Sequence, residues 1–113
     1  MRWNAFTVAM LLMLPLTALA EKTYTPAQLR KMVESGKPPK QGPPSNQKVE
    51  MPFSECVAKV TSTSNAVREN YPVHVLVDTA VLFTVKVWTN DAAMLLSCSK
   101  PDGAFLATTS KYL

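Results

Sequence analysis

Few side chains in this sequence have the chemistry of a catalytic site. His74 is the single histidine among 113 residues, and no serine or aspartate stands at a motif position relative to it. The three glycines, Gly36, Gly42 and Gly103, are too dispersed to form a phosphate-binding loop. We therefore predict no catalytic residue and no cofactor, and we interpret the protein as a non-enzyme.

The sequence gives only weak indications of two other kinds of chemistry, metal binding and hydrolysis by a pair of carboxylates. His74, Trp88 and Met94 fall on neighbouring predicted strands, and small exported copper carriers use such ligands. The alternation of side chains along a strand places Met94 on the face opposite His74 and Trp88, so we expect no metal site. The two catalytic carboxylates of a glycoside hydrolase cannot be recognised from a short sequence motif. A small muralytic hydrolase of the envelope and a periplasmic soft-metal carrier are therefore the alternative functions.

Cys56 and Cys98 are the two cysteines of the sequence. They lack the C-x-x-C spacing of a redox pair and the neighbouring histidines of a zinc site. An even number of cysteines in an exported chain predicts a disulfide, and only one pairing is possible. The bond would close a loop of about 43 residues, which the chain-entropy model values at about 4 kcal/mol of stability.

The first 20 residues resemble a secretory signal peptide in their composition. Arg2 precedes an apolar stretch from about Phe6 to Leu19, and small residues at Ala18 and Ala20 mark a cleavage site. The apolar stretch is shorter than the roughly 20 residues needed to span a bilayer. We expect cleavage after Ala20, no stable membrane insertion afterwards, and a mature protein in the bacterial periplasm or secreted.

The charge of the chain argues against nucleic acid as a partner. The sequence has 12 basic and 8 acidic residues, which leaves a net charge of +3 once Arg2 is removed with the signal peptide. The basic residues are spread along the chain rather than clustered. This pattern favours solubility over binding to a polyanion.

Residues 21–48 predict a short helix followed by a linker. Thr25 at the N-cap, Pro26 at the first helical position and Gln28 three residues past the cap indicate a helix that ends at Gly36. Residues 37–48 contain four prolines and no apolar side chain suited to a core. They therefore predict a proline-rich linker.

Residues 49–113 predict a disulfide-stapled α+β domain. Apolar side chains at helical spacing favour a helix over about residues 53–69, with a strand near residues 49–53 as the alternative. Four strands follow, at about residues 73–77, 82–88, 93–99 and 104–109, and their short connections predict antiparallel neighbours. The expected fold is one helix packed on a four-stranded antiparallel meander, preceded by the short helix and the linker.

The predicted disulfide decides which sheet face packs on the long helix. The residues expected on the core face with Cys98 are Val73, Val75, Val77, Phe83, Val85, Val87, Met94 and Leu96. The opposite face is expected to carry His74, Leu76, Leu82, Thr84, Lys86, Trp88, Leu95, Ser97 and Phe105. This second face is more apolar than a sheet face that meets solvent, so either the helix near residues 25–35 or another protein should cover it.

We hypothesise that this second face binds a partner. The apolar stripe of the short helix is narrow, and tryptophan is enriched among the anchors of protein interfaces. The expected contact residues are Trp88, Leu76, Leu82, Lys86 and His74. The function that follows is a small exported binding or assembly module of the bacterial cell envelope, whose partner is another envelope protein or a second copy of the chain.

Overall fold

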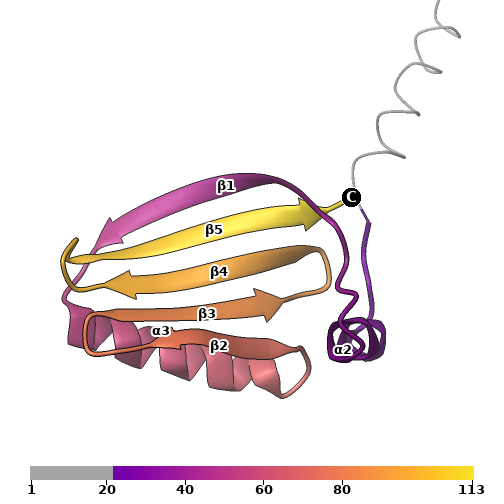
Figure 1. Ribbon diagram of the computed structural model, residues 1–113, viewed down its shortest axis with the longest axis horizontal. Helices are drawn as coiled ribbons and strands as arrows, with labels where there is room; N and C mark the ends of the chain where they lie inside the picture. Colours follow the sequence, from indigo (N-terminus) through magenta and orange to yellow (C-terminus); the bar gives the residue numbers. More distant parts are fainter. Residues whose placement is uncertain (1–21) are drawn as a thin grey trace, which may run out of the picture.

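The computed structural model describes residues 22–113, so the predicted signal peptide lies outside the described residues. The elements are helix α2 (Pro26–Glu34), strand β1 (Gln41–Glu50), helix α3 (Phe53–Arg68) and strands β2 (Val73–Asp78), β3 (Leu82–Trp88), β4 (Ala92–Ser99) and β5 (Ala104–Tyr112). The strands form one sheet in the order β1-β5-β4-β3-β2 with α3 against one face (Figure 1). All neighbouring strands are antiparallel. The α+β class is confirmed.

The sheet has five strands, and the expected four-stranded sheet is wrong. The additional strand, β1, begins inside the stretch that the sequence predicts as linker. It pairs with β5 from Gln41 opposite Tyr112 to Glu50 opposite Ala104. Almost all of its side chains are exposed, so it lacks the apolar alternation by which a strand is recognised. Pro43 and Pro44 have no N–H to donate, which an edge strand tolerates.

Helix α3 confirms the prediction of a helix near residues 53–69. Its central stretch of threonine and serine residues has low helix propensity. Cys56, Val60 and Ser64 nevertheless recur every four residues and are buried. Packing of this face on the sheet therefore stabilises the helix where propensity alone would not.

The core beneath α3 contains most of the expected residues. Its buried members are Cys56, Val60, Val73, Phe83, Val85, Val87, Leu96, Cys98 and Ala107. The placement of Val75 and Val77 in this core is wrong. The register of β2 shifts between these two residues, so that Val77 pairs with Thr84, while Val75 is 49% exposed. The extra residue of this β-bulge, Leu76, reverses the side-chain alternation along the rest of the strand.

A second apolar cluster lies beneath α2. Leu29 and Val33 of this helix are buried against Trp88, Ala93 and Tyr112, with Tyr24 and Tyr71 packed around them. The capping box expected at Thr25 is present, because its hydroxyl accepts from the Gln28 N–H at 3.1 Å and the Gln28 side chain accepts from the Thr25 N–H at 2.8 Å. Helix α2 lies at one end of the sheet (Figure 1). It therefore covers part of the second face.

Arg30 joins α2 to the end of α3. One guanidinium nitrogen, Nη2, donates to the carbonyl oxygen of Glu69 at 2.9 Å and lies 3.5 Å from that of Arg68. These carbonyls belong to the negative end of the α3 dipole. Replacing Arg30 with glutamine should therefore lower the free energy of unfolding by about 1 kcal/mol in urea denaturation.

Lys37→Gln is the matched control for this prediction. Lys37 is exposed just beyond α2, so its loss should change stability by less than about 0.5 kcal/mol. Equal stability of the two variants would show that the contact between Arg30 and α3 contributes nothing.

Candidate binding groove

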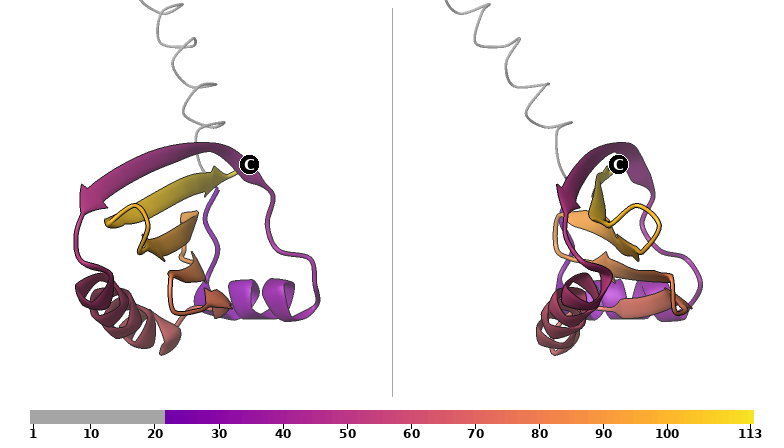
Figure 2. Two further views of the ribbon diagram at one scale, coloured as in Figure 1. Left: turned by 60° about the vertical axis from the view of Figure 1, so that its left-hand side comes forward. Right: turned by 90° about the vertical axis from the view of Figure 1, so that its left-hand side faces the viewer.

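Helix α3 is too narrow to cover its face of the sheet. The outer strands of a five-stranded sheet are about 19 Å apart at a spacing of about 4.8 Å, whereas a helix with its side chains is about 10–12 Å across. In the turned views of Figure 2, β1 forms the edge of the sheet that is farther from α3. A strip of the helix-bearing face is consequently left open beside α3.

This open strip contains an apolar groove of about 340 Å³. The residues that line it are Met51, Cys56, Lys59, Val60, Thr63, Val67, Val87, Thr89, Met94, Leu96 and Phe105. Lys59 is the only one of them that can carry a charge. The volume of the groove is at the lower end of the range for small-molecule sites.

The wall and floor of the groove come from different elements. On α3, Cys56, Val60, Thr63 and Val67 are three or four residues apart, so they lie along one side of the helix. On the sheet, Met94 of β4 lies opposite Val87 of β3. The groove is therefore a continuation of the core that no further element covers.

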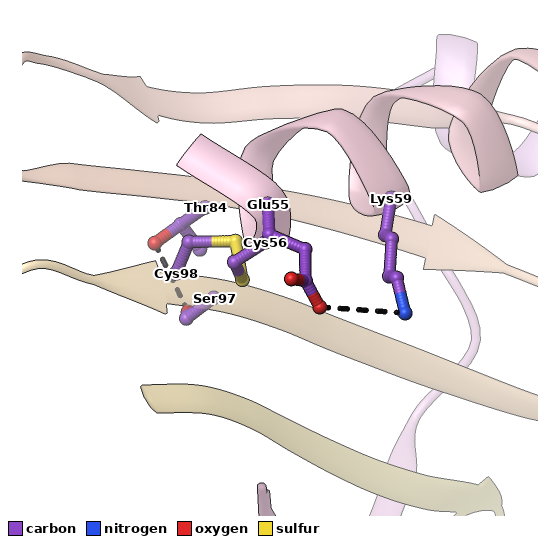
Figure 3. The surroundings of a disulfide bond; sticks show 6 residues. All are labelled: Glu55, Cys56, Lys59, Thr84, Ser97 and Cys98. Carbon is purple, nitrogen blue, oxygen red and sulfur yellow. Dashed lines mark hydrogen bonds and ion pairs between the residues drawn. A yellow bond between two sulfur atoms is a disulfide. The ribbon is translucent and has the colours of Figure 1, made fainter. Parts of the chain in front are cut away.

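The predicted disulfide is present at one end of the groove. Cys56 in the first turn of α3 is bonded to Cys98 of β4, with their Cα atoms 5.8 Å apart (Figure 3). On the same helix, Lys59 Nζ lies 3.6 Å from Glu55 Oε2, and both side chains are exposed. The covalent bond holds the start of the helix to the sheet, so this end of the groove has a fixed width.

Trp88, the central residue of the predicted contact surface, is buried, and its expected role as an exposed anchor is wrong. Its side chain is 5% exposed beneath Leu29 and Val33 of α2. The His74 ring meets it edge-on with centroids 5.1 Å apart, and Lys86 Nζ lies 5.2 Å from its ring centroid. The indole Nε1 is buried without a hydrogen-bond partner among the described residues. His74, Lys86 and Trp88 therefore lie together, but Trp88 is a buried core residue rather than an exposed contact residue.

The other two predicted contact residues lie elsewhere. Leu76 and Leu82 are exposed, near the two ends of the turn between β2 and β3. Leu82 begins β3 and Trp88 ends it, which separates them by about 20 Å along the strand. The five predicted residues therefore do not form one surface.

Phe105 lines the groove, and its expected placement on the second face of the sheet is wrong. The register of β4 with β5 places it opposite Cys98, and hence on the side of α3. The signal for this placement is the turn Lys100–Gly103. A four-residue loop pairs Ser99 with Ala104, and the next pair outward is Cys98 with Phe105.

The strand register separates the residues considered for a soft-metal site. Met94 pairs with Val87, whereas His74 pairs with Lys86, so the two side chains lie on opposite faces of the sheet. Within residues 22–113, no three His, Cys, Asp or Glu side chains lie close enough to hold a metal ion.

Tyr112 has the one clearly displaced titration among the described residues. Burial, followed by the nearby carboxylate of Asp91, raises the pKa of the Tyr112 hydroxyl. This hydroxyl donates to the carbonyl oxygen of Thr89 at 2.7 Å and lies 3.0 Å from that of Ala92. Tyr112 is therefore a neutral structural group that fixes the turn before β4.

Comparison with known proteins does not assign a family. No family model matches the sequence, and no curated protein and no solved structure matches it. Neither helix of residues 22–113 is long and apolar enough to cross a bilayer. The disulfide is compatible with an oxidising compartment outside the cytoplasm.

Proposed function

We propose that this protein is a non-catalytic binding module of the bacterial cell envelope, and that it holds an amphipathic helix of a partner protein in the groove beside α3. The observation that carries the proposal is the groove itself, an apolar concavity beside α3 that no further element covers. The signal-like residues 1–20 and the disulfide support a site of action in the periplasm or outside the cell.

The dimensions of the open strip favour a helix as the occupant. Helix α3 has 16 residues and is therefore about 24 Å long. Packed helices lie about 8–10 Å apart, so a second helix beside α3 would lie over β4 and β5. It would cover Met94 and Phe105, which are only partly buried, and it would complete the helical layer on this face.

The groove also has the side chains of an adaptable helix-binding site. Met51 and Met94 are flexible and polarisable, as in grooves that accept apolar residues of varied shape. Lys59 and Glu55 present one charge of each sign beside the apolar lining. They are suited to the polar edge of an amphipathic helix.

Addition of a strand to the sheet is less favoured than occupation of the groove. At one edge of the sheet, strand β1 contains Pro43, Pro44 and Lys48, and at the other edge, strand β2 is distorted by the bulge at Leu76. Prolines, lysines and bulges at sheet edges are features that oppose pairing with another strand. Both edges of this sheet are therefore protected.

Site-specific photocrosslinking tests the proposal. A benzophenone amino acid at Thr63, which lines the groove and is exposed, should give a covalent adduct in cells. Mass spectrometry should map the adduct to a partner segment with apolar residues three and four apart. Adding Met94→Glu should reduce the adduct at least about tenfold, because it places a charge in the apolar contact.

Ser62 is the matched control position. It precedes Thr63 on α3 and is exposed, but it does not line the groove, so the same crosslinker there should give no such adduct. Adducts of equal yield at both positions, no adduct at Thr63, or an adduct to a lipid, an extended segment or a second copy of the chain would each contradict the proposal.

A further inference from the structure

A second concave site, of about 340 Å³, lies where α2, the end of α3 and the start of β2 meet. Figure 1 shows α2 at the end of the molecule where α3 ends and β2 begins. The polar groups that line the site are Arg30, Glu34, Arg68 and His74, and its apolar wall includes Val33 and Tyr71. It shares no lining residue with the groove beside α3.

The end of α3 would repel an anion if its carbonyl groups were bare. Arg30 donates to the Glu69 carbonyl at 2.9 Å and lies 3.5 Å from the Arg68 carbonyl. Its positive charge therefore covers the negative end of the helix. A guanidinium has five N–H donors, so Arg30, which lines the site, retains further donors.

Arg68 supplies a second guanidinium without a partner of its own. Its side chain is exposed and makes no ion pair or hydrogen bond with another residue of the range 22–113. A planar guanidinium matches the two oxygens of a carboxylate, and both ions can bind through parallel hydrogen bonds. Arg68 is thus free to meet a ligand at the mouth of the site.

The charges and walls of the site indicate the kind of anion. Arg30 and Arg68 contribute two positive charges and Glu34 one negative charge, and the excess of one matches a single carboxylate better than a dianionic phosphate. Val33 and Tyr71 offer an apolar surface to the rest of the ligand. Glu34 can accept a hydrogen bond from an N–H of the ligand.

We propose that this site binds the carboxylate of an N-acylated amino acid or the C-terminus of a peptide. The carboxylate pairs with Arg68 beside Arg30, the adjacent amide N–H faces Glu34, and the side chain packs on Val33 and Tyr71. The inference is independent of the groove and of its proposed occupant.

Nuclear magnetic resonance titration of the disulfide-bonded protein, residues 21–113, tests this inference with N-acetyl-leucine as the probe. We expect saturable shifts of the amide signals of Val33, Arg68 and His74, and no saturable shift with N-acetyl-leucinamide, which lacks the carboxylate. Arg68→Gln should weaken binding of N-acetyl-leucine about tenfold or more, because a charged hydrogen-bonded pair is lost.

Lys100→Gln removes an equal charge from the exposed turn between β4 and β5, which lines neither concave site, and should leave the affinity unchanged. The remaining amide signals of Arg68→Gln should match those of the wild type, which shows that the variant is folded. Equal binding of the amide analogue would show that the site recognises only the apolar part of the ligand and not its carboxylate. Tighter binding of inorganic phosphate would make it a general anion site. Either result, the absence of saturable shifts, or an unchanged affinity of Arg68→Gln would overturn the proposal.

Discussion

Replacement of Cys56 and Cys98 together by alanine is expected to lower the free energy of unfolding by about 2–5 kcal/mol, as is typical for native bridges of small secreted domains. The bond joins residues 42 positions apart and fixes α3 to β4, and both cysteines are fully buried. The expected loss is a large fraction of the stability of a domain of this size. Guanidinium denaturation of the oxidised wild type and the double variant measures it.

The reduced wild type separates the crosslink from the packing of the two side chains. It keeps both sulfur atoms in the core and lacks only the bond, so its denaturation midpoint should fall close to that of the double variant. If the oxidised and reduced wild-type proteins unfold at the same denaturant concentration, the disulfide does not stabilise this fold.

Trp88→Ala is expected to lower the free energy of unfolding by about 3–5 kcal/mol, the usual cost of truncating a buried aromatic residue. Trp88 is one of the three sheet residues, with Ala93 and Tyr112, on which Leu29 and Val33 of α2 pack. The variant should therefore also release α2, and a protease should cleave near residues 26–34 faster than in the wild type. Denaturation and limited proteolysis provide the two measurements.

Trp88→Phe is the control for this variant. It retains an aromatic ring beneath α2, and the indole Nε1 that it removes has no hydrogen-bond partner among the described residues. Its stability loss should be well below that of Trp88→Ala. A loss under about 1 kcal/mol for Trp88→Ala would mean that α2 does not pack on this residue in solution.

The part of the fold that follows residue 50 could largely be predicted because its patterns are strong. Apolar residues at helical spacing indicate α3, alternating apolar residues indicate β3, and the turn Lys100–Gly103 separates the last two strands. The disulfide followed from the number of cysteines and the expected export. These features depend on residues near one another in the sequence or on a single possible pairing.

The rest of the fold depends on interactions between distant segments. Strand β1 is polar and exposed, so only its pairing with β5 identifies it. The bulge at Leu76 moves Val77 to the other face, and local sequence does not show it. Trp88 was expected to be exposed because the sequence does not show whether α2 covers the second face of the sheet. The groove could not be predicted because it depends on β1. This unpredicted strand makes the sheet too wide for α3 alone to cover.

The position of β5 has a consequence for folding kinetics. It lies between β1 and β4, so β1 has no strand neighbour until β5 has joined the sheet, and the segment between them contains α3 and the other three strands. Pairing across such a separation carries a large loop-closure entropy and slows folding. The antiparallel run from β2 to β4 involves only local contacts and can form first. Pairing of the first strand with the last is therefore expected to be a late and slow step in the folding of this chain.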